Sequence, residues 1–325
     1  MTAGLELRSS KPSRGLRTPL LPWIAQPRAS RSTLLRWRGR ISDLGLQDKL
    51  PTSDLWAERV ADLAHAALID ELETWPKPGL VSPVDSGSHH DMDAGTLRRS
   101  AAAIRPYFAA LVAAGRRDAG MDELRAIGLR AEAAMLAATG GVNAHRGAIF
   151  SLGLICAGAG VAGQVSAPAE ARAEAVARLW GGAIASAPAS ADSHGGRAAR
   201  RYGVGGASAE AAAGFPTIRV VGLPALRLGR VHAPEDPEAA RVQCFFALLA
   251  VLDDTNLLHR GGADGLTRAR EAATAFIESG GIAAPDWRDR AVAIHRSFVA
   301  AGLSPGGCAD LLATTLFLDA LSRDV

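Results

Sequence analysis

Helical spacing of apolar residues, interrupted by glycine and proline, is the feature that most limits what this 325-residue chain can fold into. Apolar side chains recur every three or four positions, which is typical of helices with one buried face. Ala and Gly are abundant and aromatic residues make up only 5% of the chain, so neighbouring helices can approach closely. Because no run alternates between apolar and polar residues, we expect an all-α fold. The expected helices cover residues 55–73, 94–115, 122–138, 145–163, 168–187, 207–213, 238–259, 263–279, 286–301 and 307–322.

The middle of the chain, residues 188–237, is polar and rich in Gly and Pro. Only residues 207–213 have helical spacing there. Long connections without secondary structure of their own are commonly functional. We therefore expect one long functional loop between two groups of helices.

The N-terminal segment, residues 1–54, differs in composition from the rest. Its first 50 residues hold ten Lys or Arg and three acidic residues, and they have neither helical periodicity nor the pattern of a secretory signal. We expect a basic extension without regular structure, followed by a single helical domain over residues 55–325.

Charge and cysteine usage exclude several classes of protein. The net charge of +3 comes from the extension, and the remaining chain is mildly acidic, which argues against a nucleic-acid surface. No uncharged apolar run is long enough to span a membrane. The three cysteines, Cys156, Cys244 and Cys308, are scattered without a zinc or disulfide spacing, as is usual in a reducing compartment. We expect a cytoplasmic protein that binds neither nucleic acid nor a membrane.

A glycine-rich turn over residues 139–147 reads Thr-Gly-Gly-Val-Asn-Ala-His-Arg-Gly and leads directly into a helical pattern. Glycines expose backbone amides, and the start of a helix attracts an anion. These properties predict a phosphate site, although such a turn can also simply cap a core helix. The phosphate-binding candidates of this turn are Thr139, Gly140, Gly141, Asn143, His145 and Arg146.

Four further clusters have the same character, at residues 76–79, 87–93, 253–262 and 304–312. Each combines Gly or Pro with titratable or hydrogen-bonding side chains at the edge of an apolar helical run. One such cluster would be ordinary, but five predict a single site built from the ends of several helices.

In this order, the five clusters resemble the triphosphoribosyl-dephospho-CoA synthase family, and the likeness covers residues 60–322. The segments Ser-His-Gly-Gly-Arg at 193–197, Arg-Tyr-Gly-Val at 201–204 and Gly-Phe-Pro at 214–216 are more similar to the malonate decarboxylase branch than to the citrate lyase branch. The resemblance implies a transferase that joins the triphosphoribosyl unit of ATP to 3′-dephospho-CoA and releases adenine.

The resemblance also implies the partners. The substrates are ATP, with Mg²⁺, and 3′-dephospho-CoA. The product is the precursor of a prosthetic group, so the indirect partners are the phosphoribosyl-dephospho-CoA transferase and the acyl carrier subunit of malonate decarboxylase. The oligomeric state is open, with a homo-oligomer as one alternative.

Three other functions compete with this one. The same reaction could serve citrate lyase. A metal-dependent helical phosphohydrolase is suggested by His89-His90-Asp91 and Asp253-Asp254, although it needs more histidine ligands than the sequence places on helices. A non-catalytic binding protein would leave the helix-end clusters unexplained.

Acidic side chains are the candidates for catalysis and for binding Mg²⁺. Asp91 and Asp93 lie two residues apart before a helix, so both could face one ion. Asp253, Asn256 and Arg260 have the spacing of one helical face. Apolar neighbours of the Asp253–Asp254 pair predict that at least one of the two points inward. The catalytic candidates are Asp91, Asp93, Glu132, Asp253 and Asp254, and the metal candidates are Glu71, Asp91 and Asp254.

The remaining candidates are cations and donors for the substrate. Lys77 could meet a phosphate or be an ordinary solvated lysine, and Glu132 could be a buried ligand or base or merely solvated. Arg146 and Arg260 lie beside glycines at helix ends, whereas Asp310 is assigned only to the helix dipole. The substrate-binding candidates outside the glycine-rich turn are Lys77, His89, Arg260, Gly306 and Gly307, and His194 and Tyr202 are expected on the CoA side.

Overall fold

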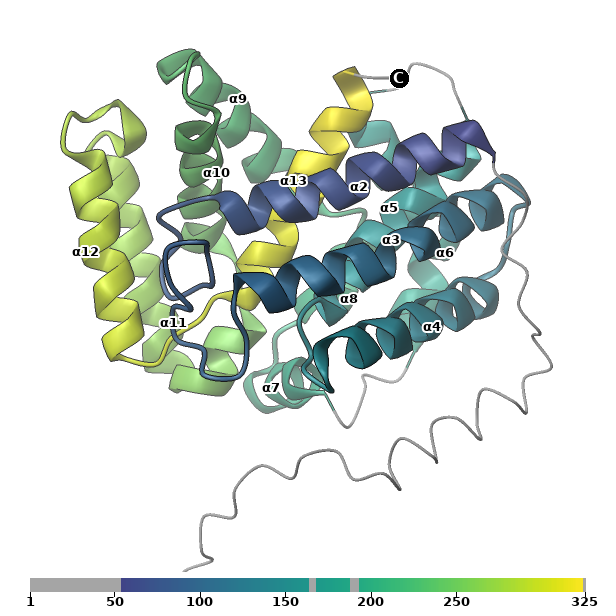
Figure 1. The fold of residues 1–325 in the computed structure, drawn as a ribbon, viewed down its shortest axis with the longest axis horizontal. Helices are drawn as coiled ribbons and strands as arrows, with labels where there is room; N and C mark the ends of the chain where they lie inside the picture. The colour runs from purple at the N-terminus through teal and green to yellow at the C-terminus, as the bar shows by residue number, and fades with distance from the viewer. Residues whose placement is uncertain (1–53, 164–167, 188–192, 324–325) are drawn as a thin grey trace, which may run out of the picture. The chain divides into compact units, whose positions relative to one another are not determined.

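The computed structural model describes residues 54–163, 168–187 and 193–323, and these residues form helices without a β-strand among them (Figure 1). The predicted all-α fold is therefore confirmed. The helices are α2 (Leu55–Glu73), α3 (Ala94–Arg116), α4 (Met121–Thr139), α5 (Arg146–Ala162), α6 (Ala169–Ser186), α7 (His194–Tyr202), α8 (Gly206–Ala212), the π-helix η1 (Ile218–Gly222), α9 (Leu223–His232), α10 (Pro237–Val251), α11 (Thr255–Glu278), the 3₁₀-helix η2 (Gly281–Ala283), α12 (Trp287–Ala300) and α13 (Gly306–Arg323).

Most helix ends follow directly from the sequence. Asp54 caps α2 by accepting a hydrogen bond from the Trp56 amide at 3.0 Å. Gly140 ends α4 in the left-handed conformation, with φ at 68°, which glycine adopts without steric cost. Pro237 begins α10 at the position where its missing amide hydrogen costs nothing.

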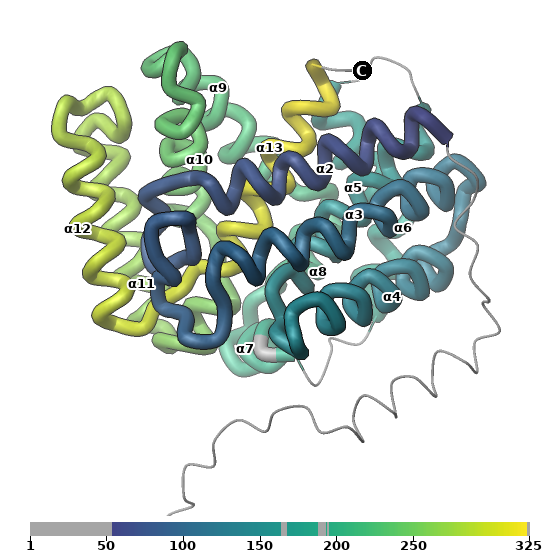
Figure 2. Tube along the Cα trace, in the orientation of Figure 1, coloured from purple at the N-terminus to yellow at the C-terminus, as the bar shows by residue number. Residues whose placement is uncertain are grey.

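Helix α5 is the centre of the packing. It contacts α3, α4, α6 and α13, and every residue from 151 to 160 is buried. A Cβ atom on Gly115 of α3 would overlap the backbone carbonyl of Ala157, so the glycine permits the close contact between α3 and α5. The tube in Figure 2 shows α3 lying along α2 and α4, and α13 running behind α2.

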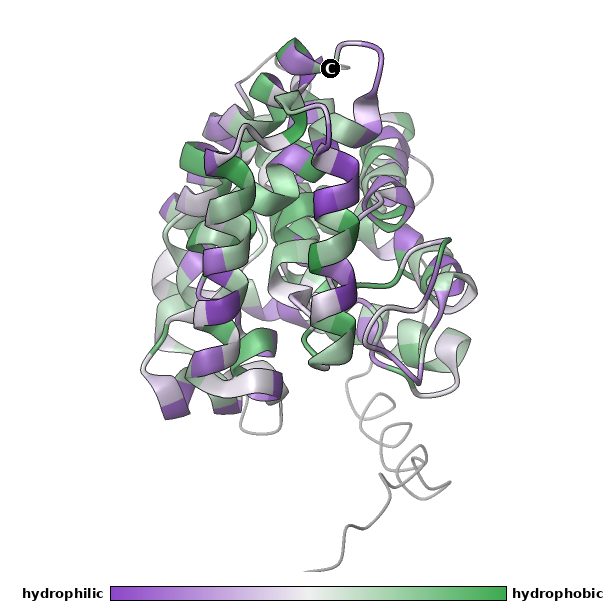
Figure 3. Ribbon diagram, turned by 90° about the vertical axis from the view of Figure 1, so that its left-hand side faces the viewer, coloured by the Kyte–Doolittle hydropathy of each residue, from purple (hydrophilic) through white to green (hydrophobic). Residues whose placement is uncertain are grey.

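The apolar core extends through both halves of the helical domain. In Figure 3 hydrophobic and hydrophilic residues alternate along the helices, as amphipathic helices require. In the second half, the rings of Phe246 and Phe276 stack with centroids 3.9 Å apart and join α10 to α11. None of the described helices is sufficiently long and apolar to cross a membrane.

The central segment departs from the prediction of a long loop. From residue 193 onward it is largely helical, as α7, α8, η1 and α9. Its glycines mark helix boundaries: Gly203, with φ at 69°, ends α7. The segment is built of short helices because its glycines and prolines separate Ala-rich and Leu-containing stretches of at most ten residues.

The predicted helix over residues 238–259 is also wrong, because the chain leaves the helix after Val251 and re-enters it at Thr255. Asp254 is the N-cap of the new helix, α11. Asp253 therefore lies outside the helix and does not share a helical face with Asn256 and Arg260.

Candidate functional site

Four helix ends meet at one place: the C-terminal end of α2 and the N-terminal ends of α5, α11 and α13. Carboxylates make the connections between them. The groups that make them are Asp254, Asp310 and the ion pair of Glu71 with Lys77.

Asp254 joins the starts of α11 and α13. Its Oδ1 accepts hydrogen bonds from the amides of Asn256 at 2.8 Å and Leu257 at 3.1 Å, and its Oδ2 accepts one from the amide of Cys308 at 2.8 Å. The side chain is buried, which raises its pKa, while the three amide donors lower it. The prediction that one member of the aspartate pair points inward is confirmed. Asp253 is exposed and forms an ion pair with Arg270 at 2.9 Å.

Asp310 bridges α13 and α5. A Cβ atom on Gly147 would overlap Asp310 Oδ2, and the carboxylate accepts a hydrogen bond from the Ala148 amide. Burial raises the pKa of Asp310 well above its ordinary value, and the neighbouring carboxylates of Glu71 and Asp254 raise it further. Unlike Asp254, Asp310 remains partly exposed.

From the sequence, Asp310 was expected only to serve the helix dipole. Its partner across the interface, Gly147, was visible only as one more glycine in the turn. The contact between them depends on the packing of α5 against α13, which sequence spacing does not determine.

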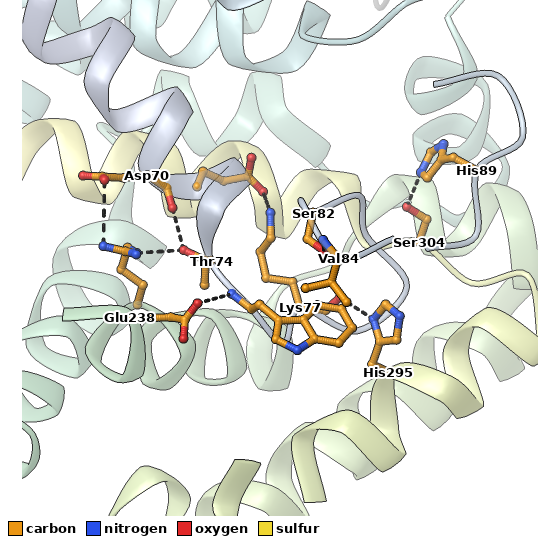
Figure 4. A network of polar contacts seen from close by, with 12 residues as sticks. Asp70, Thr74, Lys77, Ser82, Val84, His89, Glu238, His295 and Ser304 are labelled. Carbon is orange, nitrogen blue, oxygen red and sulfur yellow. Dashed lines mark hydrogen bonds and ion pairs between the residues drawn. The ribbon is translucent and has the colours of Figure 1, made fainter. Parts of the chain in front are cut away.

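Lys77 is fully buried and forms an ion pair with Glu71 (Figure 4). Burial lowers the pKa of Lys77, and the adjacent Glu71 carboxylate opposes that shift. The alternative of an ordinary solvated lysine is therefore wrong. Lys77 therefore neutralises Glu71, whose carboxylate neighbours that of Asp310.

Side chains of α10 and α12 hold the loop that carries Lys77 in place. His295 of α12 is buried, and its Nδ1 lies 3.0 Å from the Lys77 carbonyl oxygen and 3.3 Å from the Gly79 amide nitrogen. The Trp75 ring packs edge-on against the His295 ring, with centroids 4.5 Å apart, and the Trp75 amide donates to Glu238 of α10 at 3.2 Å. Figure 4 shows these contacts around Lys77. Sequence reasoning missed His295, because a lone histidine on an amphipathic helix has no distinguishing spacing.

A second group of predicted residues, His89, Asp91 and Arg260, gathers beside Ser304. His89 Nδ1 lies 3.3 Å from Arg260 Nη2 and 3.6 Å from Asp91 Oδ1. Since a guanidinium only donates, Nδ1 accepts and Nε2 donates to Ser304 Oγ at 2.8 Å. Burial and the neighbouring Arg260 lower the pKa of His89, so the ring is neutral at pH 7. Arg260 also donates to the carbonyl oxygens of Ser88 at 3.1 Å and Gly302 at 3.2 Å.

Asp93 lies apart from this group as the N-cap of α3. It is exposed and accepts hydrogen bonds from the Thr96 amide at 2.7 Å and from Thr96 Oγ1 at 2.8 Å. These two bonds lower the pKa of Asp93. Its local role is to start α3, and the proposal that Asp91 and Asp93 face one ion stays a prediction.

The glycine-rich turn connects α4 to α5. Thr139 Oγ1 donates to the Val142 carbonyl at 2.6 Å, and Asn143 Oδ1 accepts from the Arg146 amide at 3.2 Å. Arg146 forms an ion pair with Glu132 at 2.9 Å. Burial raises the pKa of Glu132, and Arg146 opposes that shift, so Glu132 is paired and not merely solvated; its role as a base stays a prediction. Both Gly140 and Gly141 have positive φ.

His145, the N-cap of α5, is buried between Ser100 and Lys77. Its Nδ1 lies 2.7 Å from Ser100 Oγ, and its Nε2 has no hydrogen-bond partner among the described residues. Burial, together with Lys77 and His65, lowers the pKa of His145 to about 4. The imidazole is therefore neutral at pH 7.

Gly306 and Gly307 allow the starts of α13 and α11 to touch. A Cβ atom on Gly307 would lie 3.0 Å from Asp254 Oδ2, and one on Gly306 would press against the Asn256 side chain. The amide of Cys308, in the same turn, already donates to Asp254. An internal carboxylate thus satisfies part of this helix N-terminus.

The predicted magnesium ligands do not form a ligand set. Glu71 pairs with Lys77, Asp254 accepts from three amides, and Asp91 lies with His89. Across the part of the chain that the structure describes, no three His, Cys, Asp or Glu side chains are arranged to hold a metal ion. A Mg²⁺ ion held by one or two of these carboxylates together with ATP phosphates stays a prediction.

Together, the fold and the site define an all-α protein whose helix ends gather carboxylates, amides and guanidinium groups. Amides at helix starts and guanidinium groups are the donors that bind phosphate groups in proteins.

Comparison with known proteins identifies the family. The chain belongs to the family of ATP:dephospho-CoA triphosphoribosyl transferases, whose model matches residues 57–325. It is 44% identical to a probable 2-(5''-triphosphoribosyl)-3'-dephosphocoenzyme-A synthase of Stutzerimonas stutzeri, over 82% of this chain and 92% of that protein. A protein of the same description from Pseudomonas aeruginosa strain PAO1 is 43% identical over 83% of this chain and 93% of its own length. The predicted family and the predicted transferase class are confirmed. No solved structure matches the chain significantly.

Proposed function

We propose that this protein transfers the triphosphoribosyl group of ATP to the 2′-hydroxyl of 3′-dephospho-CoA and releases adenine. Family membership over nearly the whole helical domain supports the reaction. The structural observation that carries the proposal is the carboxyl of the half-buried residue Asp310, held where the starts of α5 and α13 meet.

The reaction replaces one bond at C1 of the ATP ribose by another. The bond from C1 to the adenine nitrogen breaks, the acceptor oxygen bonds to C1, and the hydroxyl proton ends on adenine. The transition state resembles an oxocarbenium ion, as in other glycosyl transfers. We assign to Asp310 the transfer of the proton from the hydroxyl to adenine, because its carboxyl has a raised pKa and the residue is only half-buried, whereas Asp254 is fully buried. Asp254 is closed to this role, since its oxygens are buried and bonded to amides.

Arg260, His89 and Asp91 are the groups that we assign to the triphosphate. The Arg260 guanidinium supplies charge for phosphate oxygens, and the exposed Asp91 carboxylate beside it can face the Mg²⁺ that ATP carries. Lys77 is buried, so it acts through Glu71 and the shape of the site and does not reach a phosphate.

Product analysis tests the reaction. Incubation with ATP, Mg²⁺ and 3′-dephospho-CoA should give adenine and the triphosphoribosyl product in equal amounts, and ATP alone should give neither. CoA should be a poor acceptor, because its 3′-phosphate crowds the 2′-hydroxyl. Formation of ADP or phosphate would indicate the phosphohydrolase instead, which would require a ligand set that the described residues lack.

The destination of the product is a further part of the proposal. The segments at 193–197, 201–204 and 214–216 support malonate decarboxylase as the enzyme whose acyl carrier subunit receives the prosthetic group. Intact mass of that subunit, from cells with and without this protein, tests the assignment. If, in cells without this protein, only the acyl carrier of citrate lyase lost its prosthetic group, the assignment would change to citrate lyase.

A further inference from the structure

One segment of the chain reaches both parts of the proposed site. Residues 77–89 begin at Lys77, inside the carboxylate cluster, and end at His89, in the group that we assign to the triphosphate. All of these residues are described, and none of them belongs to a helix or a strand. The positions of both ends therefore depend on the contacts that the segment makes within itself and with the helices around it.

The segment is folded tightly upon itself at two glycines. The Ser88 amide donates to the Gly79 carbonyl oxygen at 3.0 Å. A Cβ atom on Gly87, whose φ is 55°, would lie 2.6 Å from the carbonyl oxygens of Gly79 and Leu80. Because these contacts join the beginning of the segment to its end, a shift at one end displaces the other.

His295 of α12 holds this folded segment from the inside. His295 is only 2% exposed, and its Nδ1 lies 3.0 Å from the Lys77 carbonyl oxygen and 3.3 Å from the Gly79 amide nitrogen (Figure 4). Its Nε2 lies 3.2 Å from Asp85 Oδ2, at the distance of an ion pair but without the geometry of a hydrogen bond. One imidazole thus contacts the segment at three positions, and Lys77 is one of them.

The contacts of Nδ1 are harder to replace than that of Nε2. The Gly79 amide is in a buried residue and has no other acceptor among the described residues, and a buried amide without an acceptor is costly. A ring nitrogen either donates to the Lys77 carbonyl or accepts from the Gly79 amide, and in both states it holds the same turn. Asp85, in contrast, also accepts from the Gly87 amide and has a side chain that is 44% exposed, so water can replace the imidazole there.

We infer that His295 is a positioning residue for the reaction. Through Nδ1 it fixes the segment so that Lys77 pairs with Glu71 at one end and His89 faces the triphosphate at the other. The inference rests on the proposed function. Helix α12 supplies none of the groups that we assign to substrate contact, so His295 acts through the segment and not on the substrate.

Three substitutions separate Nδ1 from the rest of the ring. The carboxamide of His295→Asn places a polar atom near the position of Nδ1, whereas that of His295→Gln reaches the position of Nε2. His295→Phe fills the space without a polar atom. Arg290→Gln is the control, because the Arg290 guanidinium donates to the carbonyl oxygens of Ser279 and Gly281 and so joins the same helix to another part of the chain.

The kinetics and the exchange of amide hydrogens are measured for each protein at a temperature where all are folded. We expect His295→Gln and His295→Phe to lower kcat/KM for ATP about tenfold or more, within the range that misplaced site groups cost. Both kcat and KM should change, since the segment reaches both parts of the site. Without substrate, the amides of Gly79 and Ser88 should exchange faster in these two variants. His295→Asn should restore most of the activity and slow the exchange again, and Arg290→Gln should keep wild-type kinetics even if it melts earlier.

Several results would overturn the inference. Wild-type kinetics in His295→Gln or His295→Phe would show that the reaction does not depend on His295. Equal losses in His295→Asn and His295→Phe would show that Nδ1 is not the group that matters, and an equal loss in Arg290→Gln would indicate a general weakening of α12. If His295→Phe does not fold, the comparison of His295→Gln with His295→Asn decides, since both carry the same carboxamide. If the wild-type protein forms no product, the proposed function fails, whereas the exchange rates still show whether His295 holds the segment.

Discussion

Asp310 of α13 and Gly147 of α5 lie so close together that any side chain at residue 147 would overlap the Asp310 carboxylate. This contact sets the position of Asp310, because the adjacent Ala148 amide donates to the same carboxylate. The position of the carboxyl to which we assign proton transfer therefore depends on the absence of a single methyl group on the neighbouring helix.

Gly147→Ala should displace Asp310 and reduce kcat/KM at least about a hundredfold, the scale expected when a catalytic group is misplaced by about an ångström. Activity and thermal unfolding are measured on the same samples. Gly128→Ala on α4 is the matched control, since a Cβ atom there would meet nothing within 4 Å. It should keep activity and gain up to about 1 kcal/mol of stability from helix propensity. Full activity in Gly147→Ala would show that the position of Asp310 does not matter for the reaction.

Asp310→Asn keeps the shape of the side chain and removes its proton chemistry. We expect turnover to fall by about 3 kcal/mol of barrier or more, the scale of one lost group in an active site. Stability should change in the opposite direction. The pKa of Asp310 is raised in the folded protein, so ionisation costs the wild type stability as the pH rises above about 3.9, where an unfolded aspartate titrates, through the folded pKa.

The melting temperature of Asp310→Asn should therefore increase relative to that of the wild type as the pH rises from 4 to 8. Asp264→Asn, an exposed substitution on α11, controls for the loss of one charge. A variant that melts below the wild type at pH 8, or that keeps normal turnover, would show that the Asp310 carboxylate is structural.

The sequence predicted the positions of most helices and the gathering of the polar clusters at helix ends. The contacts of individual side chains were harder to predict. The helix bounds of α2, α3, α5 and α13 agree within about a residue, since each is a long stretch with helical spacing, and Asp54 and Asp93 cap α2 and α3. The central loop was misjudged, because glycine and proline also separate short helices. Asp254 was correctly expected to point inward, but its bonds to two helix starts depend on tertiary packing.

Asp254→Asn should mainly reduce stability. An amide at this position can still accept from Asn256 and Leu257, but its NH₂ group would face the Cys308 amide, leaving two donors opposed. A buried donor without an acceptor costs about 1–3 kcal/mol. Urea unfolding measures the change, and the exposed Asp253→Asn, which should stay within about 0.5 kcal/mol, is the control. Equal stability of the two variants would mean that Asp254 does not join α11 to α13.

Lys77→Met should destabilise the protein by about 3–5 kcal/mol, because it leaves Glu71 charged and unpaired in a buried site. Methionine has a similar length, so the loss reports the missing charge more than a cavity. Adding Glu71→Gln should restore much of the stability, since a neutral amide does not need the ammonium group. A double-mutant cycle by urea unfolding measures the coupling. If the Glu71 carboxylate is needed to raise the pKa of Asp310, the double variant should be stable but weakly active. Full activity of the double variant would show that the Lys77–Glu71 pair has only a structural role.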